Sequence, residues 1–96
     1  MKIFWSSIEY SYINNRALQG GFVYIFVSAT NKTEALSRIC KALKKNDMQL
    51  LNCEFIEEYT PSIKWKTKKL SAHYNSLYEE AKVTKECIFD NFYAYE

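Results

Sequence analysis

Apolar residues recur at every second position near the start of the chain, which is the pattern of a β-strand with one covered face. Over residues 2–12 the apolar face consists of Phe4, Ile8, Tyr10 and Tyr12. Residues 21–29 are apolar or β-branched on both faces, which is typical of a strand inside a sheet. Turn-forming residues separate the two predicted strands and consist of Asn14, Asn15, Gly20 and Gly21.

A helix follows the second predicted strand. Asn31 is a favourable N-cap residue, and Glu34, three residues later, completes the pattern of a capping box. The apolar positions behind it have helical spacing and are Ala35, Leu36, Ile39, Cys40 and Leu43. Lys44 and Lys45 suit the last turn, because the helix dipole favours positive charge there. The pattern predicts a helix over residues 32–45.

A third strand is predicted over residues 48–59. Apolar and polar residues alternate there, with Leu51, Cys53 and Phe55 facing inward. Pro61 lies just beyond this strand, and proline ends a strand because it has no N–H group to donate.

The last third of the chain predicts a helix and a closing strand. Residues 62–67 are compatible with a short edge strand or with a loop pinned by Trp65. Helical spacing then runs from residue 68 to about 82, with apolar positions at Leu70, Tyr74, Leu77, Tyr78 and Ala81. Residues 86–95 are apolar at alternate positions and form the closing strand.

The order of elements is therefore β-β-α-β-α-β, which predicts an α+β fold. We expect a two-layer sandwich, in which a four-stranded sheet has both helices on one face. The segments that contain the helices are long enough to cross over the sheet. The chain has 96 residues, so it has room for a single domain that spans residues 1–96.

Composition and cysteine usage indicate a globular chain in a reducing compartment. Hydrophobic residues make up 48% and charged residues 25%, which excludes a disordered chain. The longest apolar run, residues 22–27, is far shorter than the ~20 residues of a membrane span, and residues 1–12 lack the apolar core of a signal peptide. Because the cysteines are odd in number and widely spaced, we interpret Cys40, Cys53 and Cys87 as small buried apolar residues of a cytoplasmic protein.

The sequence offers little for catalysis. Its single histidine, His73, has no serine or cysteine partner that would complete a triad, so we expect a surface or boundary residue. Adjacent carboxylates, as in Glu57 and Glu58 or Glu79 and Glu80, diverge on a strand or helix and form no dyad. The spacing of metal ligands and the glycine-rich phosphate loop are both missing from the sequence. We therefore expect no enzyme activity, no metal and no cofactor.

Charge is distributed in blocks of alternating sign. The formal net charge is only +2, but residues 31–45 sum to +4, residues 46–60 to −4, residues 61–75 to +4 and residues 76–96 to −3. Such blocks predict separate acidic and basic patches on a small domain.

One basic block contains an aromatic residue. We call it the basic run, and its members are Lys64, Trp65, Lys66, Lys68 and Lys69. In a protein that binds single-stranded nucleic acid, a base would stack on the indole while the lysines contact phosphates. The same run is compatible with an indole packed at the edge of the core beneath solvated lysines, or with binding of an acidic protein.

The acidic residues that follow the first helix predict a surface for a basic protein partner. We call them the acidic set, and its members are Glu54, Glu57, Glu58 and Tyr59, with Glu79 and Glu80 as an extension. Carboxylates steer a basic partner during encounter, and tyrosine supplies rigid contact area. A face of solvated charges without a partner is the alternative.

A small α+β domain with no catalytic residues, eight tyrosines and dense charge blocks resembles bacterial immunity proteins. These are the cytoplasmic antidotes of contact-dependent and other polymorphic toxin systems, and the likeness covers the whole chain, above all residues 22–59. The resemblance implies a cognate toxin domain, often a nuclease, that the antidote binds and blocks at or near its active site. Antidotes of nucleases are commonly acidic, whereas this chain has a charge of +2, so a nuclease target requires a local acidic patch.

Three functional hypotheses result from these patterns. The first is a non-enzymatic immunity protein that neutralises a toxin domain by occluding it through the acidic set. The second is a small nucleic-acid-binding accessory domain that uses the basic run. The third is a domain that holds a small ligand between its sheet and its helices.

Overall fold

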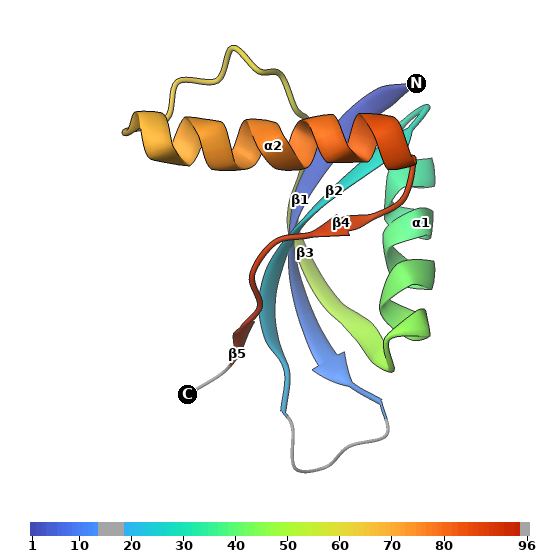
Figure 1. Ribbon diagram of the computed structural model, residues 1–96. Helices are drawn as coiled ribbons and strands as arrows, with labels where there is room; N and C mark the ends of the chain where they lie inside the picture. The colour runs from blue at the N-terminus through green and yellow to red at the C-terminus, as the bar shows by residue number, and fades with distance from the viewer. Residues whose placement is uncertain (14–18, 95–96) are drawn as a thin grey trace.

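Two long antiparallel strands form the centre of a single sheet. The computed structural model describes residues 1–13 and 19–94 (Figure 1), so Asn14 and Asn15 of the predicted loop lie outside the described residues. The first two predicted strands are confirmed as β1 (Lys2–Tyr12) and β2 (Gly21–Ala29), which pair with each other. The third is confirmed as β3 (Met48–Glu58), which pairs with the other side of β1. β1 is therefore hydrogen-bonded along both of its edges.

Two short strands cover the free side of β2. The sequence predicts one strand over residues 86–95, of which residue 95 lies outside the described residues; instead β4 (Ile88–Phe89) and β5 (Tyr93–Ala94) each pair antiparallel with β2. β5 approaches closely because Gly21 has no side chain, and a Cβ there would lie 2.1 Å from the carbonyl oxygen of Tyr93. The strand order is β3-β1-β2-β4, with β5 also beside β2.

The helix α1 (Lys32–Lys45) begins and ends where the sequence predicts. The Asn31 side chain accepts a hydrogen bond from the backbone N–H of Glu34 at 2.8 Å, which caps the helix. The Glu34 carboxylate accepts a second hydrogen bond, from the Thr30 hydroxyl at 2.7 Å. After α1 the chain turns into β3 through Asp47, whose backbone is left-handed with a φ of 58°.

The helix α2 (Lys68–Thr84) starts at the predicted residue and runs slightly beyond the predicted end. Thr67 caps it by accepting a hydrogen bond from the backbone N–H of Leu70 at 3.1 Å. The preceding residues 62–67 form no strand, so the alternative of a loop pinned by Trp65 is confirmed.

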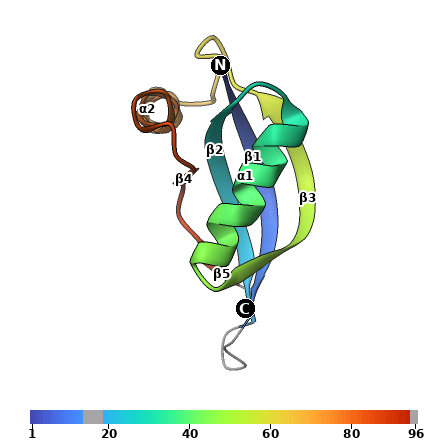
Figure 2. The same ribbon diagram turned by 90° about the vertical axis from the view of Figure 1, so that its right-hand side faces the viewer.

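The two helices cover opposite faces of the sheet, so the prediction that both lie on one face is wrong (Figure 2). α1 packs Ile39 and Leu43 against the face that holds Ile8. α2 packs Ala81 against the other face, which holds Phe26. Because β2 is apolar on both sides and Ile3 and Trp5 of β1 extend the second side, each side needs its own cover. The α+β class is confirmed, and the sheet and both helices form one compact domain.

Aromatic rings fill the core beneath α2. We call this the aromatic cluster, and its members are Trp5, Tyr24, Phe26, Phe55, Tyr59, Trp65, Tyr74 and Tyr78. Trp5 meets Phe55 and Trp65 edge-on, with ring centroids 4.8 Å and 5.5 Å away. Such contacts stabilise beyond the burial of apolar area. The cluster therefore joins the three long strands to α2 and to the loop before it.

Replacing Phe26 with alanine should weaken the attachment of α2 to the sheet. Phe26 is fully buried and its ring contacts Trp5 and Tyr59, so Phe26→Ala should lower the free energy of unfolding by about 3–5 kcal/mol. Urea unfolding followed by tryptophan fluorescence measures this loss. Phe92→Ala removes a half-exposed ring and should cost about 1 kcal/mol or less. Equal losses in the two variants would contradict the assignment of Phe26 to the core.

Candidate functional site

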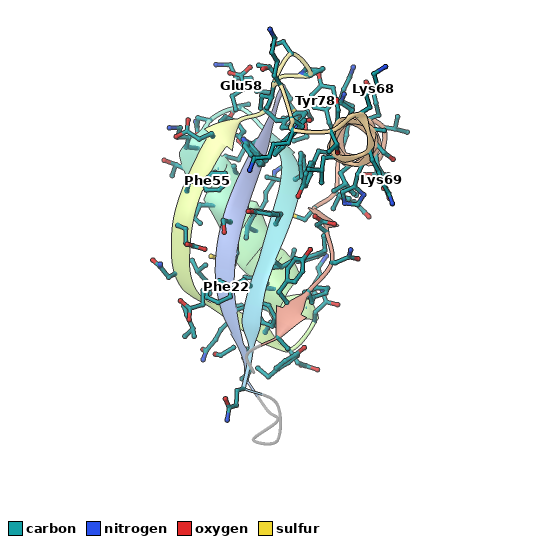
Figure 3. The ribbon with its side chains drawn as sticks, turned by 90° about the vertical axis from the view of Figure 1, so that its left-hand side faces the viewer. Phe22, Phe55, Glu58, Lys68, Lys69 and Tyr78 are labelled. Atoms are coloured by element: carbon teal, nitrogen blue, oxygen red, sulfur yellow. The ribbon has the colours of Figure 1, made fainter. Side chains whose placement is uncertain are left out.

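The acidic residues at the end of β3 lie at an open edge of the sheet. Among the described residues β1 is the only strand beside β3, and no helix lies beyond this edge (Figures 2 and 3). Glu57 and Glu58 are exposed there, with carboxylate oxygens 3.8 Å from the Lys32 ammonium and 3.6 Å from the Lys2 ammonium, respectively. Exposed ion pairs at these distances contribute little to stability, so both carboxylates can exchange their lysine for another cation.

Glu54 lines a hollow that the sequence did not indicate. The hollow has a volume of about 330 Å³, and we call it the aromatic hollow, lined by Ser7, Phe22, Val23, Tyr24, Glu54 and Tyr93. It lies on the sheet face opposite α1, where Figure 3 shows Phe22. The Ser7 hydroxyl donates a hydrogen bond to the Glu54 carboxylate at 2.8 Å. The site therefore combines one oriented carboxylate with partly exposed aromatic rings.

Strand pairing brings the residues of the aromatic hollow together. The register between β1 and β3 shifts after Ser7, and Glu54 falls at this irregularity, without a partner on β1. Tyr93 reaches the hollow because β5 pairs it with Phe22. These residues come from four separate parts of the sequence, so no local motif could have predicted the hollow.

Tyr59 is not a surface residue, and its assignment to the acidic set is wrong. Its side chain is 2% exposed and belongs to the aromatic cluster. Its hydroxyl donates a hydrogen bond to the Asn75 amide oxygen at 2.6 Å and accepts one from the Trp65 indole N–H at 3.4 Å. β3 ends at Glu58. The Tyr59 side chain then points into the core, where it contacts Trp65 of the loop and Asn75 of α2.

Glu79 and Glu80 are exposed on α2, but the structure does not bring them to the other carboxylates. α2 lies on the side of β2 and β4, whereas β3 is the opposite edge of the sheet (Figures 2 and 3). Glu79 also lies 3.9 Å from the ammonium group of Lys82 on its own helix. The acidic set therefore divides into Glu54, Glu57 and Glu58 on β3 and a separate pair on α2.

Trp65 of the basic run packs at the edge of the core, as one of the alternatives predicts. Its ring stacks on Tyr74 with centroids 4.3 Å apart and donates its N–H within the aromatic cluster. The lysines of the run are exposed, and Figure 3 shows Lys68 and Lys69 on α2, away from the strands. Because Tyr74 occupies a face of the indole, no contact in the structure favours base stacking on Trp65.

The single histidine has an acidic partner that the sequence did not indicate. Nε2 of His73 lies 2.8 Å from Oδ1 of Asp90, and the Asp90 side chain is only 4% exposed. His73 itself is 44% exposed, as expected of a boundary residue. The backbone N–H of Asp90 donates to the carbonyl oxygen of Tyr24 at 2.9 Å. Asp90 therefore fixes the segment between β4 and β5 to both α2 and β2.

The cysteines are free thiols and are half-buried, which corrects the expectation that they are buried. Burial raises the pKa of the Cys87 thiol to about 11, and nearby Arg38 lowers this value only in part. Burial also raises the pKa of the Cys53 thiol. Cys87 and Cys53 are therefore protonated at neutral pH, and such thiols are poor nucleophiles.

Comparisons with known proteins do not assign the chain to a family. No protein-family model, no curated protein and no solved structure matches it. In residues 1–13 and 19–94, neither helix is long and apolar enough to cross a membrane. Over the same residues, His, Cys, Asp and Glu do not gather in groups of three or more that could hold a metal. Function must therefore be inferred from the surfaces themselves.

The thiol of Cys87 should react slowly until the pH is strongly alkaline. In a variant with Cys40→Ser and Cys53→Ser, reaction with a disulfide reagent at pH 8 should be about 100-fold slower than that of free cysteine, because the thiolate is the reactive form. The rate should rise about tenfold for each pH unit and level off near the pKa of about 11. The same variant unfolded in urea is the control, and a rate that levels off below pH 9 in the folded protein would contradict the burial of this thiol.

The same pKa shift predicts the sign of a change in stability. The folded-state pKa of about 11 exceeds the ordinary value of 9.0. Below pH 9 the neutral thiol therefore makes its full contribution to the free energy of unfolding. This contribution is lost as the pH rises through about 11. Urea unfolding of the same variant at several alkaline pH values measures this loss.

Proposed function

We propose that this chain is a non-enzymatic binding protein that neutralises a bacterial toxin domain by occluding it, in the manner of immunity proteins. The contact surface is the β3 edge together with the aromatic hollow, and we call it the β3 surface. The observation that favours this function is the placement of Glu54, Glu57 and Glu58 beside an open strand edge and exposed rings. The proposed place of action is the cytoplasm, whose reducing conditions suit free thiols.

The open edge of β3 offers backbone hydrogen bonds to a partner. The N–H and C=O groups along the outer side of an edge strand are unpaired within the sheet, and a strand of another protein can add there. Pairing between β1 and β3 is regular from Phe4 opposite Glu58 to Ser7 opposite Phe55. Beyond that point the bulged edge twists away, which disfavours addition of a strand. A partner strand would therefore pair beside Glu57 and Glu58.

The aromatic hollow suits a lysine or arginine side chain of the partner. The aliphatic stem of such a side chain would pack against the rings of Phe22 and Tyr93, which also attract a cation through their faces. Its charged end would reach the Glu54 carboxylate, which the hydroxyl of Ser7 orients. The β3 surface thus recognises a basic protein domain, although the whole chain has a charge of +2.

Charge reversal at the end of β3 should slow association with the partner. Sequencing of the DNA that flanks this gene supplies the partner to test, which is the C-terminal domain of a long upstream reading frame. The double variant Glu57→Lys and Glu58→Lys should reduce the association rate about tenfold or more at low ionic strength, and the difference should shrink in high salt. Surface plasmon resonance over a salt series measures the rates.

Two controls separate the surface from the function. The same reversal at Glu79 and Glu80 should have a much smaller effect, because these residues lie on the other side of the sheet. Unchanged rates in the β3 variant would remove the β3 surface from the interface. If the wild-type chain fails both to bind the neighbouring domain and to rescue growth of cells that express it, the proposed antidote function is wrong.

Removing the charge of Glu54 should shorten the lifetime of the complex. Glu54→Gln keeps the shape of the side chain and a hydrogen bond with Ser7, but leaves the incoming cation without its carboxylate. We expect the dissociation rate to rise by about 10-fold and the free energy of unfolding to change by less than about 1 kcal/mol. Dissociation kinetics and urea unfolding of the same sample measure both. A dissociation rate equal to that of the wild type would contradict the use of the aromatic hollow.

A further inference from the structure

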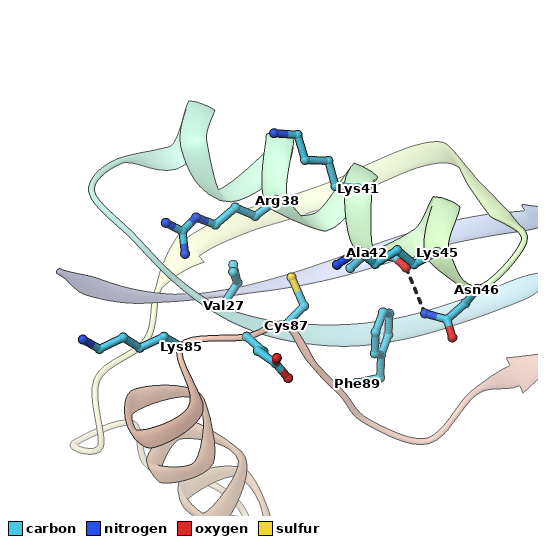
Figure 4. Close-up of a pocket in the computed structure, with 10 residues that line it drawn as sticks. Val27, Arg38, Lys41, Ala42, Lys45, Asn46, Lys85, Cys87 and Phe89 are labelled. Atoms are coloured by element: carbon cyan, nitrogen blue, oxygen red, sulfur yellow. Dashed lines mark hydrogen bonds between the residues drawn. The ribbon is translucent and has the colours of Figure 1, made fainter.

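A groove between α1 and β4 gathers positive charge. It encloses about 490 Å³ (Figure 4) and lies on the face of the sheet that α1 covers, opposite the aromatic hollow. Its cationic side chains are Arg38, Lys41, Lys45 and Lys85. Glu86 is the carboxylate among its lining residues, so four cations face one anion. We call it the basic groove.

Two elements supply the cations of the basic groove. Arg38, Lys41 and Lys45 are three and four residues apart on α1, which places them in a row along the helix. Lys85 follows the last residue of α2, and Figure 4 shows its side chain extending to the same end of the groove as that of Arg38. Like charges around one cavity repel one another, so an anion between them would relieve this repulsion.

Among the described residues, the lysines of the basic groove have no ion-pair partner within 4.0 Å. Arg38 lies 3.3 Å from Glu34, but in the part of the chain that the structure describes Lys41, Lys45 and Lys85 form no ion pair. Among the described residues, Glu86 is therefore the carboxylate that offsets the charge of these lysines within the groove.

The backbone at Lys85 ends α2 beside the basic groove. It is left-handed, with a φ of 59°, as the C-cap of α2. Glycine is favoured at this position because a side chain makes the conformation costly.

The floor of the basic groove is apolar. Val27, Cys87 and Phe89 lie beneath the charged side chains, and Val27 is fully buried. The side-chain amide of Asn46 donates a hydrogen bond to the carbonyl oxygen of Ala42 at 2.9 Å (Figure 4), which covers an acceptor that would repel an anion. A ligand with both a charged part and an apolar or planar part matches this lining.

We propose that the basic groove binds a small organic phosphate of nucleotide size. Its phosphate groups would lie among Arg38, Lys41 and Lys85, and its planar part would rest on the floor at Phe89. Arginine and lysine are the usual ligands of phosphate oxygens. The groove volume is that of sites for small molecules. This site is separate from the β3 surface, so its test does not depend on the proposed antidote function.

Titration with ATP in the absence of Mg²⁺, at low salt, tests the basic groove by calorimetry. Saturable binding is expected, and Lys41→Glu should weaken it about tenfold or more because it reverses a charge in the groove. Lys44→Glu makes the same change at an exposed neighbour on α1 that does not line the groove, and it should change the affinity less than about threefold. Glu86→Gln removes the opposing carboxylate and should raise the affinity several-fold.

The outcomes separate the proposal from its competitors. Absence of saturable ATP binding, or equal losses in Lys41→Glu and Lys44→Glu, would overturn it. Adenosine that binds as tightly as ATP would show that the phosphates do not contribute, and binding of a single-stranded oligonucleotide without binding of ATP would assign the charge to nucleic acid instead. If Lys41→Glu does not fold, the expected rise in affinity for Glu86→Gln still decides the matter, and an unchanged affinity in that variant would contradict the site.

Discussion

The strand β2 is apolar on both faces, and the other elements are placed by the need to keep water from both. α1 covers most of the length of the sheet face that holds Ile8 and Val27. On the other face, α2 and the aromatic cluster cover the end near Phe26. Tyr93 of β5 covers only part of the rest of that face, and the aromatic hollow is the space that remains uncovered. The candidate binding site is thus a consequence of how the second core is closed.

Local features of the sequence were sufficient to predict the two helices and the three long strands, but not how the helices are arranged. The cap at Asn31 and the periodicity behind it define α1, because both are satisfied within a few residues. Which face a helix covers depends instead on contacts between distant residues, and two-sided apolar strands are compatible with either choice. The prediction of a single closing strand is wrong for a similar reason. The Asp90 side chain contacts His73 of α2, and the strand is interrupted there although the sequence alternates regularly.

In the candidate site, too, local features could be predicted from the sequence, whereas contacts between distant residues could not. Glu57 and Glu58 could be predicted as surface carboxylates, because ionised carboxylates are rarely buried without a partner and need no tertiary contact to be exposed. The burial of Tyr59 could not, since only the aromatic cluster determines that it turns inward. A row of cations on α1 is visible in the sequence, whereas the position of Lys85 opposite that row depends on where α2 ends.

The end of the chain contributes to both surfaces at once. Phe89 forms part of the floor of the basic groove, and Tyr93 forms a wall of the aromatic hollow on the other face. β4 and β5 have only two residues each, so this segment is the part of the sheet with the fewest backbone hydrogen bonds to lose. If it detached from β2, both sites would be dismantled in one step. A ligand on either face therefore stabilises the closed segment, and two sites that share no atom become thermodynamically coupled through a single local unfolding equilibrium.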